Sequence, residues 1–194
     1  MMMKRDWITT ILLLVNALFY AFNYHINGTH AITGLTPQEV LDAGGMNGQT
    51  STLSYLTSMF AHGSFMHFFM NMATLLALGS IVKDSYGSIF YLFTYVVSGF
   101  SGAILSAIVQ PDIATLGASG SIYGLLGMLI VGVLFKSSLT EMRSTVFFLV
   151  FVNLVYTFLD PSINATAHIT GMVVGIILSF ISLLFTKLMK NTFS

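Results

Sequence analysis

Six polar side chains inside long apolar segments have the residue types that suit chemistry: His62, His67, Asn71, Ser119, Tyr123 and His168. A serine hydroxyl is a weak nucleophile that needs a base within hydrogen-bonding reach, and histidine is the commonest base. Because the sequence contains no cysteine, a thiolate nucleophile and a thiolate metal site are both excluded. Ser119 is therefore a candidate nucleophile, and the histidines of this set are candidates for its base.

The composition indicates which kind of structure must position these side chains. Of the 194 residues, 55% are hydrophobic and 7% are charged, and the mean hydropathy is +0.85. A soluble domain carries about a quarter charged residues, so most of this chain faces lipid. Seven Lys and Arg provide no basic stripe for nucleic acid, and the apolar content is too high for a disordered chain. The lipid bilayer is the expected partner, and no nucleic-acid partner is expected.

Six apolar segments approach the length of about 20 residues that a helix needs to cross a bilayer. They run over residues 7–22, 59–81, 88–109, 116–135, 145–159 and 165–188, and the first and fifth are short for a span. The pattern predicts an all-α membrane protein, a bundle of six transmembrane helices. Short connections leave little room for anything else, so residues 1–194 are expected to form a single transmembrane domain.

The positions of the charged residues test this topology independently. All basic residues fall on one side of it: Lys4, Arg5, Lys83, Lys136, Arg143, Lys187 and Lys190. The opposite side carries Glu39, Asp42, Asp112 and Asp160. Since Lys and Arg in short loops stay on the cytoplasmic side, we expect both termini there and an even number of spans. A bacterial-type plasma membrane is the simplest location.

The connection over residues 25–58 is the longest and is expected on the outer side. Thr36 before Pro37 predicts a short capped helix within it. Long loops of this kind are usually functional, and this loop has room to form a lid.

No Asp, Glu, Lys or Arg lies deep within a predicted span, which argues against an ion pump, a voltage sensor or a proton-coupled transporter. The polar set is instead neutral, and its spacing is helical. His67 and Asn71 are four apart and share a face, as do Ser119 and Tyr123. At a rise of about 1.5 Å per residue, we expect His67 about 12 Å below the start of its span, and Ser119 and His168 about 5 Å below theirs.

Two stripes of glycine indicate which helices touch. One stripe contains Gly120, Gly124 and Gly127, and the other contains Gly171 and Gly175. Small residues at this spacing let two helix backbones approach closely in lipid. Packing the stripes together would bring Ser119 beside His168.

Three motifs follow one another along the chain: His62-x4-His67-x3-Asn71, then Gly117-Ala118-Ser119-Gly120 with Tyr123, then His168 followed by Gly171 and Gly175. In order, spacing and sidedness they resemble the motifs of the rhomboid intramembrane serine proteases, and the resemblance covers essentially the whole chain. It implies a six-helix core around a water-filled cavity that opens to the outside. It also implies cleavage of the transmembrane segments of other proteins, with no cofactor and no metal.

The resemblance implies a role for each residue. Ser119 and His168 would form a catalytic dyad, because no intramembrane carboxylate is available to orient the histidine. His67, Asn71 and the backbone N–H of Ser119 would hold the oxyanion, and each such donor is typically worth about 10²–10³ in rate. Tyr123 would pack against the imidazole. The supporting residues would be Gly117, Gly120, Gly171 and His62.

Water must reach such a site below the membrane surface. We expect His62, Gly63, Ser64 and Ser121 to line a polar pocket. The helix over residues 145–159 matches the family's gate, through which a substrate segment arrives laterally. A helical peptide bond is shielded and internally hydrogen-bonded, so substrates are expected to carry helix-breaking and small residues.

One feature departs from the family and other functions stay open. Many bacterial rhomboids carry a Trp-Arg pair in the first loop, where this chain has Leu53-Ser54-Tyr55-Leu56, so the loop must be anchored differently. Taken singly, His62 suits a structural tie between loop and helix, and Asn71 and Asn153 suit interhelical contacts. The alternative to a protease is a catalytically inactive rhomboid-like protein that binds transmembrane helices; a small transporter is a third hypothesis.

Overall fold

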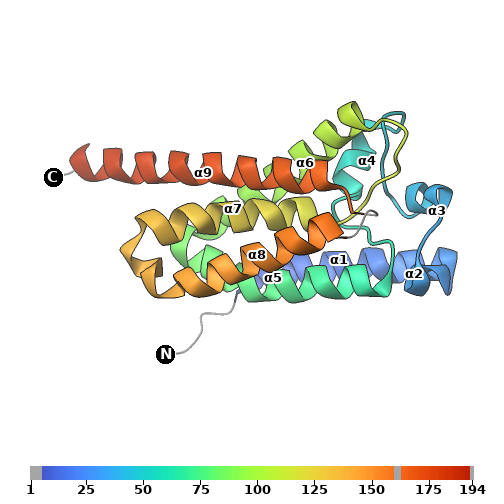
Figure 1. The fold of residues 1–194 in the computed structure, drawn as a ribbon, viewed down its shortest axis with the longest axis horizontal. Helices are drawn as coiled ribbons and strands as arrows, with labels where there is room; N and C mark the ends of the chain where they lie inside the picture. Colours follow the sequence, from blue (N-terminus) through green and yellow to red (C-terminus); the bar gives the residue numbers. More distant parts are fainter. Residues whose placement is uncertain (1–5, 160–162, 193–194) are drawn as a thin grey trace.

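The chain folds into helices joined by loops, and the computed structural model describes residues 6–159 and 163–192 (Figure 1). The long helices are α1 (Trp7–Asn27), α5 (Phe65–Tyr86), α6 (Ser88–Val109), α7 (Ser119–Phe135), α8 (Arg143–Leu159) and α9 (Ala165–Thr192). The short ones are α2 (His30–Thr33), α3 (Pro37–Asp42) and α4 (Thr52–Thr57), with a 3₁₀ turn, η1 (Ser137–Met142), before α8. The predicted all-α class is confirmed.

Within the described residues, five helical segments are long and apolar enough to cross a membrane: α1, α5, α6, η1 with α8, and α9. The first and fifth predicted spans are longer than expected, since α1 continues to Asn27 and η1 extends α8 to 23 residues. α7 is shorter, with 17 residues. The protein is therefore an integral, multi-pass membrane protein.

The second predicted span begins later than expected. Ser64 caps α5, because its side chain accepts a hydrogen bond from the N–H of His67. The helix therefore starts at Phe65 rather than at Met59. His62, which the apolar run placed within the span, belongs to the loop before it, and this expectation was wrong.

α7 forms the centre of the bundle. Nearly all of its residues from Gly120 to Val133 are buried, and it packs most extensively against α9. A Cβ on Gly171 would overlap the carbonyl oxygen of Gly120, and a Cβ on Gly175 would overlap that of Gly124. The two backbones are thus in contact along the stripes that the glycine spacing predicts.

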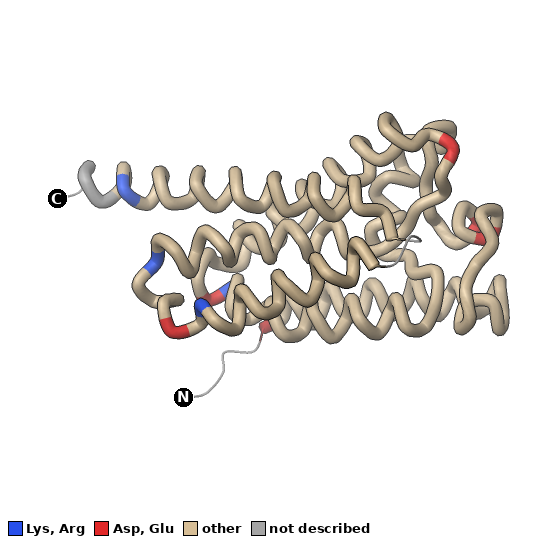
Figure 2. The backbone as a smooth tube through the Cα atoms, viewed as in Figure 1, with Lys and Arg blue, Asp and Glu red and all other residues tan. Residues whose placement is uncertain are grey.

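Charge is distributed unevenly along the bundle (Figure 2). In the part of the chain that the structure describes, Lys and Arg lie at the end of the bundle nearest the two termini. At the opposite end, around α2, α3 and the loop before α7, the charged side chains among the described residues are Asp and Glu. Lys4, Arg5 and Asp160, which also entered the topology prediction, lie outside the described residues.

The loop between α1 and α5 is anchored to the segment that precedes α7. Met46 and Thr115 exchange two backbone hydrogen bonds of 2.8 Å, and the N–H of Gly48 donates to the carbonyl of Pro111 at 2.8 Å. Tyr55, in the stretch that lacks the Trp-Arg pair, packs edge-on against Phe100 of α6. Backbone pairing and an aromatic contact therefore hold this loop.

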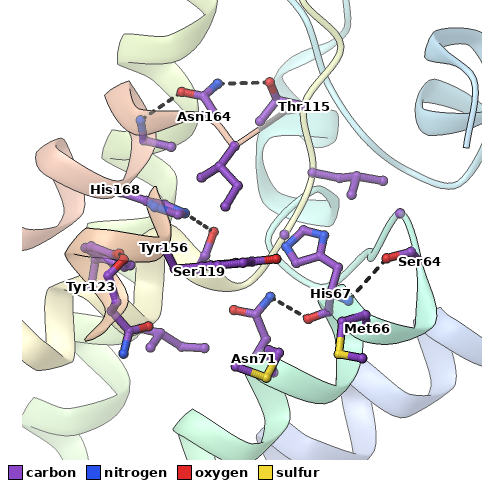
Figure 3. A pocket seen from close by; sticks show the side chains of 18 of the residues that line it. Ser64, Met66, His67, Asn71, Thr115, Ser119, Tyr123, Tyr156, Asn164 and His168 are labelled. Carbon is purple, nitrogen blue, oxygen red and sulfur yellow. Dashed lines mark hydrogen bonds between the residues drawn. The ribbon is translucent and has the colours of Figure 1, made fainter. Parts of the chain in front are cut away.

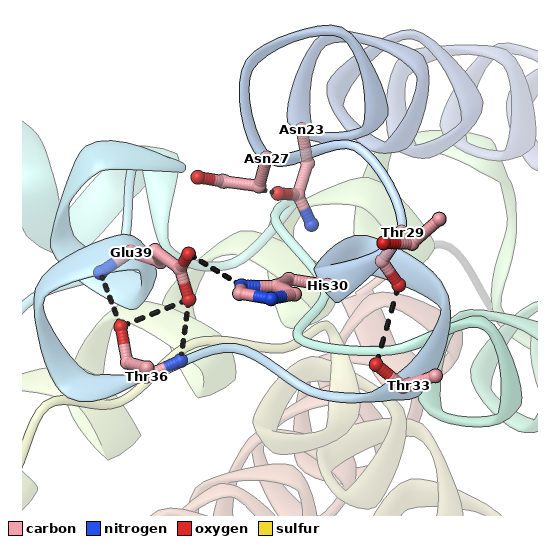
Figure 4. A network of polar contacts seen from close by, with 7 residues as sticks. All are labelled: Asn23, Asn27, Thr29, His30, Thr33, Thr36 and Glu39. Atoms are coloured by element: carbon pink, nitrogen blue, oxygen red, sulfur yellow. Dashed lines mark hydrogen bonds and ion pairs between the residues drawn. The ribbon is translucent and has the colours of Figure 1, made fainter.

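A polar network organises the start of the same loop (Figure 4). Thr36 and Glu39 form a capping box at α3, as the Thr36–Pro37 pair predicts, and Glu39 Oε1 lies 2.7 Å from Nδ1 of His30. Hydrogen bonds from the Thr36 backbone and from His30 lower the pKa of Glu39 to about 2. The carboxylate therefore joins α2 to α3 at neutral pH.

Glu39→Gln is expected to raise amide hydrogen exchange across residues 36–42, because a neutral amide oxygen accepts more weakly than a carboxylate and glutamine cannot reproduce all the hydrogen bonds of Glu39 to Thr36 and His30. Since the folded pKa of Glu39 is lowered from 4.5 to about 2, its contribution is complete above pH 4.5 and is lost as the pH falls toward 2. Glu141→Gln, at an exposed residue of η1, is the matched control. Equal exchange across residues 36–42 in all three proteins would contradict this role for Glu39.

Candidate active site

Ser119 and His168 are in contact where the N-terminal turns of α7 and α9 meet. Ser119 is the first residue of α7, and His168 lies in the first turn of α9. His168 Nε2 and Ser119 Oγ are 2.6 Å apart (Figure 3). The His168 side chain is 6% exposed, so the pair is largely shielded from solvent. The glycine-mediated contact between α7 and α9 brings these two first turns together.

Tyr123 and Thr157 hold the imidazole from two directions. The Tyr123 ring stacks on the His168 ring, with centroids 4.2 Å apart and an interplanar angle of 18°. Thr157 Oγ1, from α8, lies 2.8 Å from His168 Nδ1. The Tyr123 hydroxyl makes hydrogen bonds with Thr157 Oγ1 and with the carbonyl of Asn153. Thr157 could not be predicted as part of the site, because nothing in its local pattern distinguishes it from other threonines of an apolar helix.

Asn164 is a second residue that sequence reasoning missed. Its Oδ1 accepts a hydrogen bond from the N–H of Ala167 at 3.0 Å, in the manner of an N-cap, and one from Ser106 Oγ of α6 at 3.1 Å. Its Nδ2 donates to Thr115 Oγ1 at 3.0 Å. Asn164 thus fixes the start of α9 relative to the segment before α7. An asparagine directly before an apolar helical run is a recognisable cap signal.

His67 and Asn71 lie across the cavity from His168 (Figure 3). His67 is in the first turn of α5, so its expected depth of about 12 Å below the helix start was wrong, because α5 begins at Phe65. Asn71 Nδ2 donates to the carbonyl of His67 at 3.0 Å. That bond uses one of the two amide hydrogens of Asn71. Both residues line the same cavity as Ser119.

Gly117 brings the backbone before Ser119 close to His67. Its φ of 135° lies in a region that residues with a Cβ rarely adopt, and its N–H donates to the carbonyl of Ser58 at 2.8 Å. A Cβ at this position would lie 2.8 Å from His67 Nε2 and 3.5 Å from Ser119 Oγ. The His67 ring and the Ser119 hydroxyl therefore border one point beside Gly117.

Gly117→Ala is expected to lower the rate of any Ser119-dependent reaction by about 10²-fold, the typical cost of losing one oxyanion donor. The new methyl group would displace the His67 ring and strain the backbone next to Ser119. Gly87→Ala is the matched control, because Gly87 also has a positive φ, of 84°, but open space around its Cβ position. Equal losses in the two variants would show that backbone strain alone, and not His67, is responsible.

A cavity of about 580 Å³ joins these groups. Gly63 and Ser64 line it as predicted. Gly34 and Leu35 of the first loop, which were not predicted from the sequence, also line it. His62 and Ser121 were expected to line it as well, but both side chains are completely buried. Asn153 lines the cavity, and its amide donates to the Leu149 carbonyl in its own helix.

His62 is held beneath the first loop. Its Nδ1 lies 3.2 Å from the carbonyl of Phe60, and its own carbonyl accepts a hydrogen bond of 2.7 Å from Asn23 Nδ2 of α1. Burial, with a smaller contribution from His67, keeps the pKa of His62 well below 6.5. His62 is thus a buried residue whose ring bonds within its own loop and whose backbone carbonyl joins that loop to α1, whereas the tie expected from the sequence was to the second span.

The fold and the site together define a class of protein: a multi-pass helical membrane protein in which a serine hydroxyl and an imidazole are in hydrogen-bonding contact beside a cavity. The Rhomboid domain matches residues 49–185, so the chain belongs to the rhomboid family.

Relatives from plants and bacteria are similar to this chain. It is 34% identical over 134 residues, or 66% of its length, to RHOMBOID-like protein 6, mitochondrial, of Arabidopsis thaliana, and covers 43% of that protein. It is 34% identical over 133 residues to RHOMBOID-like protein 4 of the same plant, and covers 34% of it. It is 30% identical over 129 residues to "Putative rhomboid protease YdcA" of Bacillus subtilis, which is 65% of each chain. The chain thus spans less than half the length of these plant relatives.

Proposed function

We propose that this protein is an intramembrane serine endopeptidase that hydrolyses peptide bonds in or next to the transmembrane segments of other proteins. The observation that carries the proposal is the 2.6 Å contact between Ser119 Oγ and His168 Nε2 beside the cavity. A hydroxyl that donates to an imidazole nitrogen is the arrangement that activates serine as a nucleophile. Its position inside a membrane-spanning bundle favours a membrane-embedded substrate.

The first chemical step would use this hydrogen bond. His168 Nε2 takes the proton of Ser119 as its Oγ attacks the scissile carbonyl carbon, and a tetrahedral intermediate forms. The same nitrogen then gives the proton to the leaving amine, and water hydrolyses the resulting ester by the reverse roles. Stacking on Tyr123 keeps the imidazole plane fixed during both transfers.

The oxyanion would form next to Gly117. No side chain caps α7, so the first N–H groups of this helix, beginning with that of Ser119, are available to a negatively charged oxygen, which the helix dipole also favours. His67 and the remaining amide hydrogen of Asn71 would supply donors from the opposite side of the cavity. These groups are in place before the reaction, which is what makes such donors effective.

A substrate would reach Ser119 between α5 and α8. Met66 and Met70 of α5 and Val152 and Tyr156 of α8 line the cavity on this side. In α8 only Val146, Val150 and Thr157 are buried, so this helix is loosely packed against the rest of the bundle. A transmembrane segment with small or helix-breaking residues would supply the extended peptide that the site needs.

The remaining topology belongs to the same proposal. α7 would be the sixth span, residues 1–194 would act as one domain, and both termini would be cytoplasmic with the basic end of the bundle. The loop before α5, which lines the cavity through Gly34 and Leu35, would then face the outside in a bacterial-type plasma membrane.

Reconstitution of the purified protein with a model transmembrane substrate tests the proposed activity. The wild type is expected to cut the substrate within or beside its membrane-spanning segment, at a site that mass spectrometry of the products identifies. Ser121→Ala should cut equally well, because the Ser121 side chain points toward Gly99 of α6 and away from the cavity. Stable capture of an uncut substrate by the wild type would instead support the inactive, helix-binding alternative.

A further inference from the structure

Thr157 lies where α7, α8 and α9 meet, and it contacts His168 on the side opposite to Ser119. Its side chain is 3% exposed. Oγ1 is 2.8 Å from His168 Nδ1 and 2.9 Å from the carbonyl oxygen of Asn153 in its own helix. The Tyr123 hydroxyl bonds to the same oxygen and to the same carbonyl. Thr157, Tyr123 and the Asn153 carbonyl therefore form one hydrogen-bonded group on the Nδ1 side of the imidazole.

The direction of each hydrogen bond in this group follows from what each atom can donate. The single Tyr123 proton lies between Thr157 Oγ1 and the Asn153 carbonyl, the two atoms that its hydroxyl contacts. A carbonyl oxygen only accepts, so the proton in the bond between Thr157 Oγ1 and the Asn153 carbonyl belongs to Thr157. With its single proton used in this way, Thr157 Oγ1 presents lone pairs to His168. Nδ1 must then be the protonated nitrogen of the neutral ring. Nε2 is left with a free lone pair, which is the form that accepts the Ser119 proton.

We propose that Thr157 is a positioning residue that holds His168 in the Nδ1–H tautomer, with Nε2 directed at Ser119. It would occupy the place that a carboxylate has in a Ser-His-Asp triad, and it would do so with a neutral group that costs less to bury in a membrane protein. This inference rests on the proposed function, because it concerns the base of the proposed dyad.

Substitution of Thr157 by valine distinguishes the effect of the hydroxyl from the effect of side-chain shape. Thr157→Val preserves the approximate volume and the branching of the side chain and removes the hydroxyl, so the ring loses the acceptor that selects its tautomer. We expect kcat to fall on the order of 10–100-fold, as for a lost buried hydrogen bond, with KM within about twofold of wild type because Thr157 does not line the cavity. Thr157→Ser, which restores the hydroxyl, should recover most of the rate.

Three comparisons separate positioning from a general structural role. A small serine-reactive fluorophosphonate should label Thr157→Val more slowly by a similar factor, since this probe needs no transmembrane docking. Thr186→Val is the matched control: Thr186 makes the same hydrogen bond to the carbonyl four residues earlier, at 2.8 Å, on an exposed part of α9, and its loss should leave both rates unchanged. A fall in activity that Thr157→Ser does not rescue, or that appears only in KM, would overturn the proposal.

Nitrogen NMR of ¹⁵N-histidine-labelled wild type tests the tautomer directly, without substitution of Thr157. The protein has five histidines, and the His168 signals are assigned as those missing from His168→Ala. We expect Nδ1 to be protonated and Nε2 to be unprotonated; the opposite assignment would overturn the proposal. If the wild type neither cleaves nor labels, the proposed function fails, whereas the NMR result still decides which nitrogen of His168 carries the proton.

Discussion

Ser119→Ala is expected to lower the rate of substrate cleavage by about 10⁴-fold or more, to the level of background. The alanine removes the atom that would form the bond to the scissile carbonyl, and no other hydroxyl replaces it, because the neighbouring Ser121 is buried and directed toward α6. Cleavage in proteoliposomes, followed by gel or mass spectrometry over several decades of enzyme concentration, measures this loss.

His168→Ala should lower the rate of cleavage to the same background level, and the double variant should show no further decrease in rate. Residues that act as one unit are strongly non-additive, because either loss already removes the whole step. Additive losses would show instead that the two residues contribute separately, and a Ser119→Ala variant that still cuts would contradict the dyad outright. Circular dichroism should show the helical content of the wild type in both variants, which excludes unfolding as the cause of the lost activity.

Gly175→Ala is expected to have the second large effect, on folding. A Cβ there would overlap the carbonyl oxygen of Gly124, and neither backbone can move without separating α7 from α9. Overpacking of a well-packed core costs about 1–3 kcal/mol, and a clash between two backbones belongs at or above the upper end of that range. Thermal unfolding in detergent should show a clearly lowered Tm.

Gly120→Ala provides the matched comparison in the same interface. A Cβ on Gly120 would lie 3.5 Å from the Ala167 carbonyl oxygen, which is an ordinary contact, so its Tm is expected to fall much less than that of Gly175→Ala. Equal Tm values for the two variants would contradict the close approach of α7 to α9. Because this comparison uses only stability, its outcome is independent of whether the protein is an enzyme.

Much of the fold could be predicted because lipid imposes simple constraints. An apolar run must be helical in a bilayer, and the glycines of α7 and α9 identify the closest pair of helices. The start of α5 could not be read in the same way. Met59 and Phe60 are as apolar as the helix itself, and only the hydrogen bond from His67 to Ser64 places the boundary at Phe65.

Some residues of the candidate site could likewise be predicted from the sequence, and others could not. Ser119 and His168 could be paired from sequence because each begins a glycine stripe, so that packing the stripes together brings the two residues together. Thr157 and His62 could not be assigned in this way. Thr157 contacts His168 because of the way α8 packs, and α8 carries no glycine stripe that would predict this packing. His62 lies away from the cavity because it belongs to the loop before α5.

Covalent labelling of Ser119 is the most direct test of the central claim. After the wild type reacts with a fluorophosphonate, tryptic mass spectrometry should find the adduct on the peptide that contains Ser119, and the adduct should be absent from Ser119→Ala and from His168→Ala. An adduct on another residue, or one that forms on Ser119 at the same rate without His168, would contradict a nucleophile activated by that histidine.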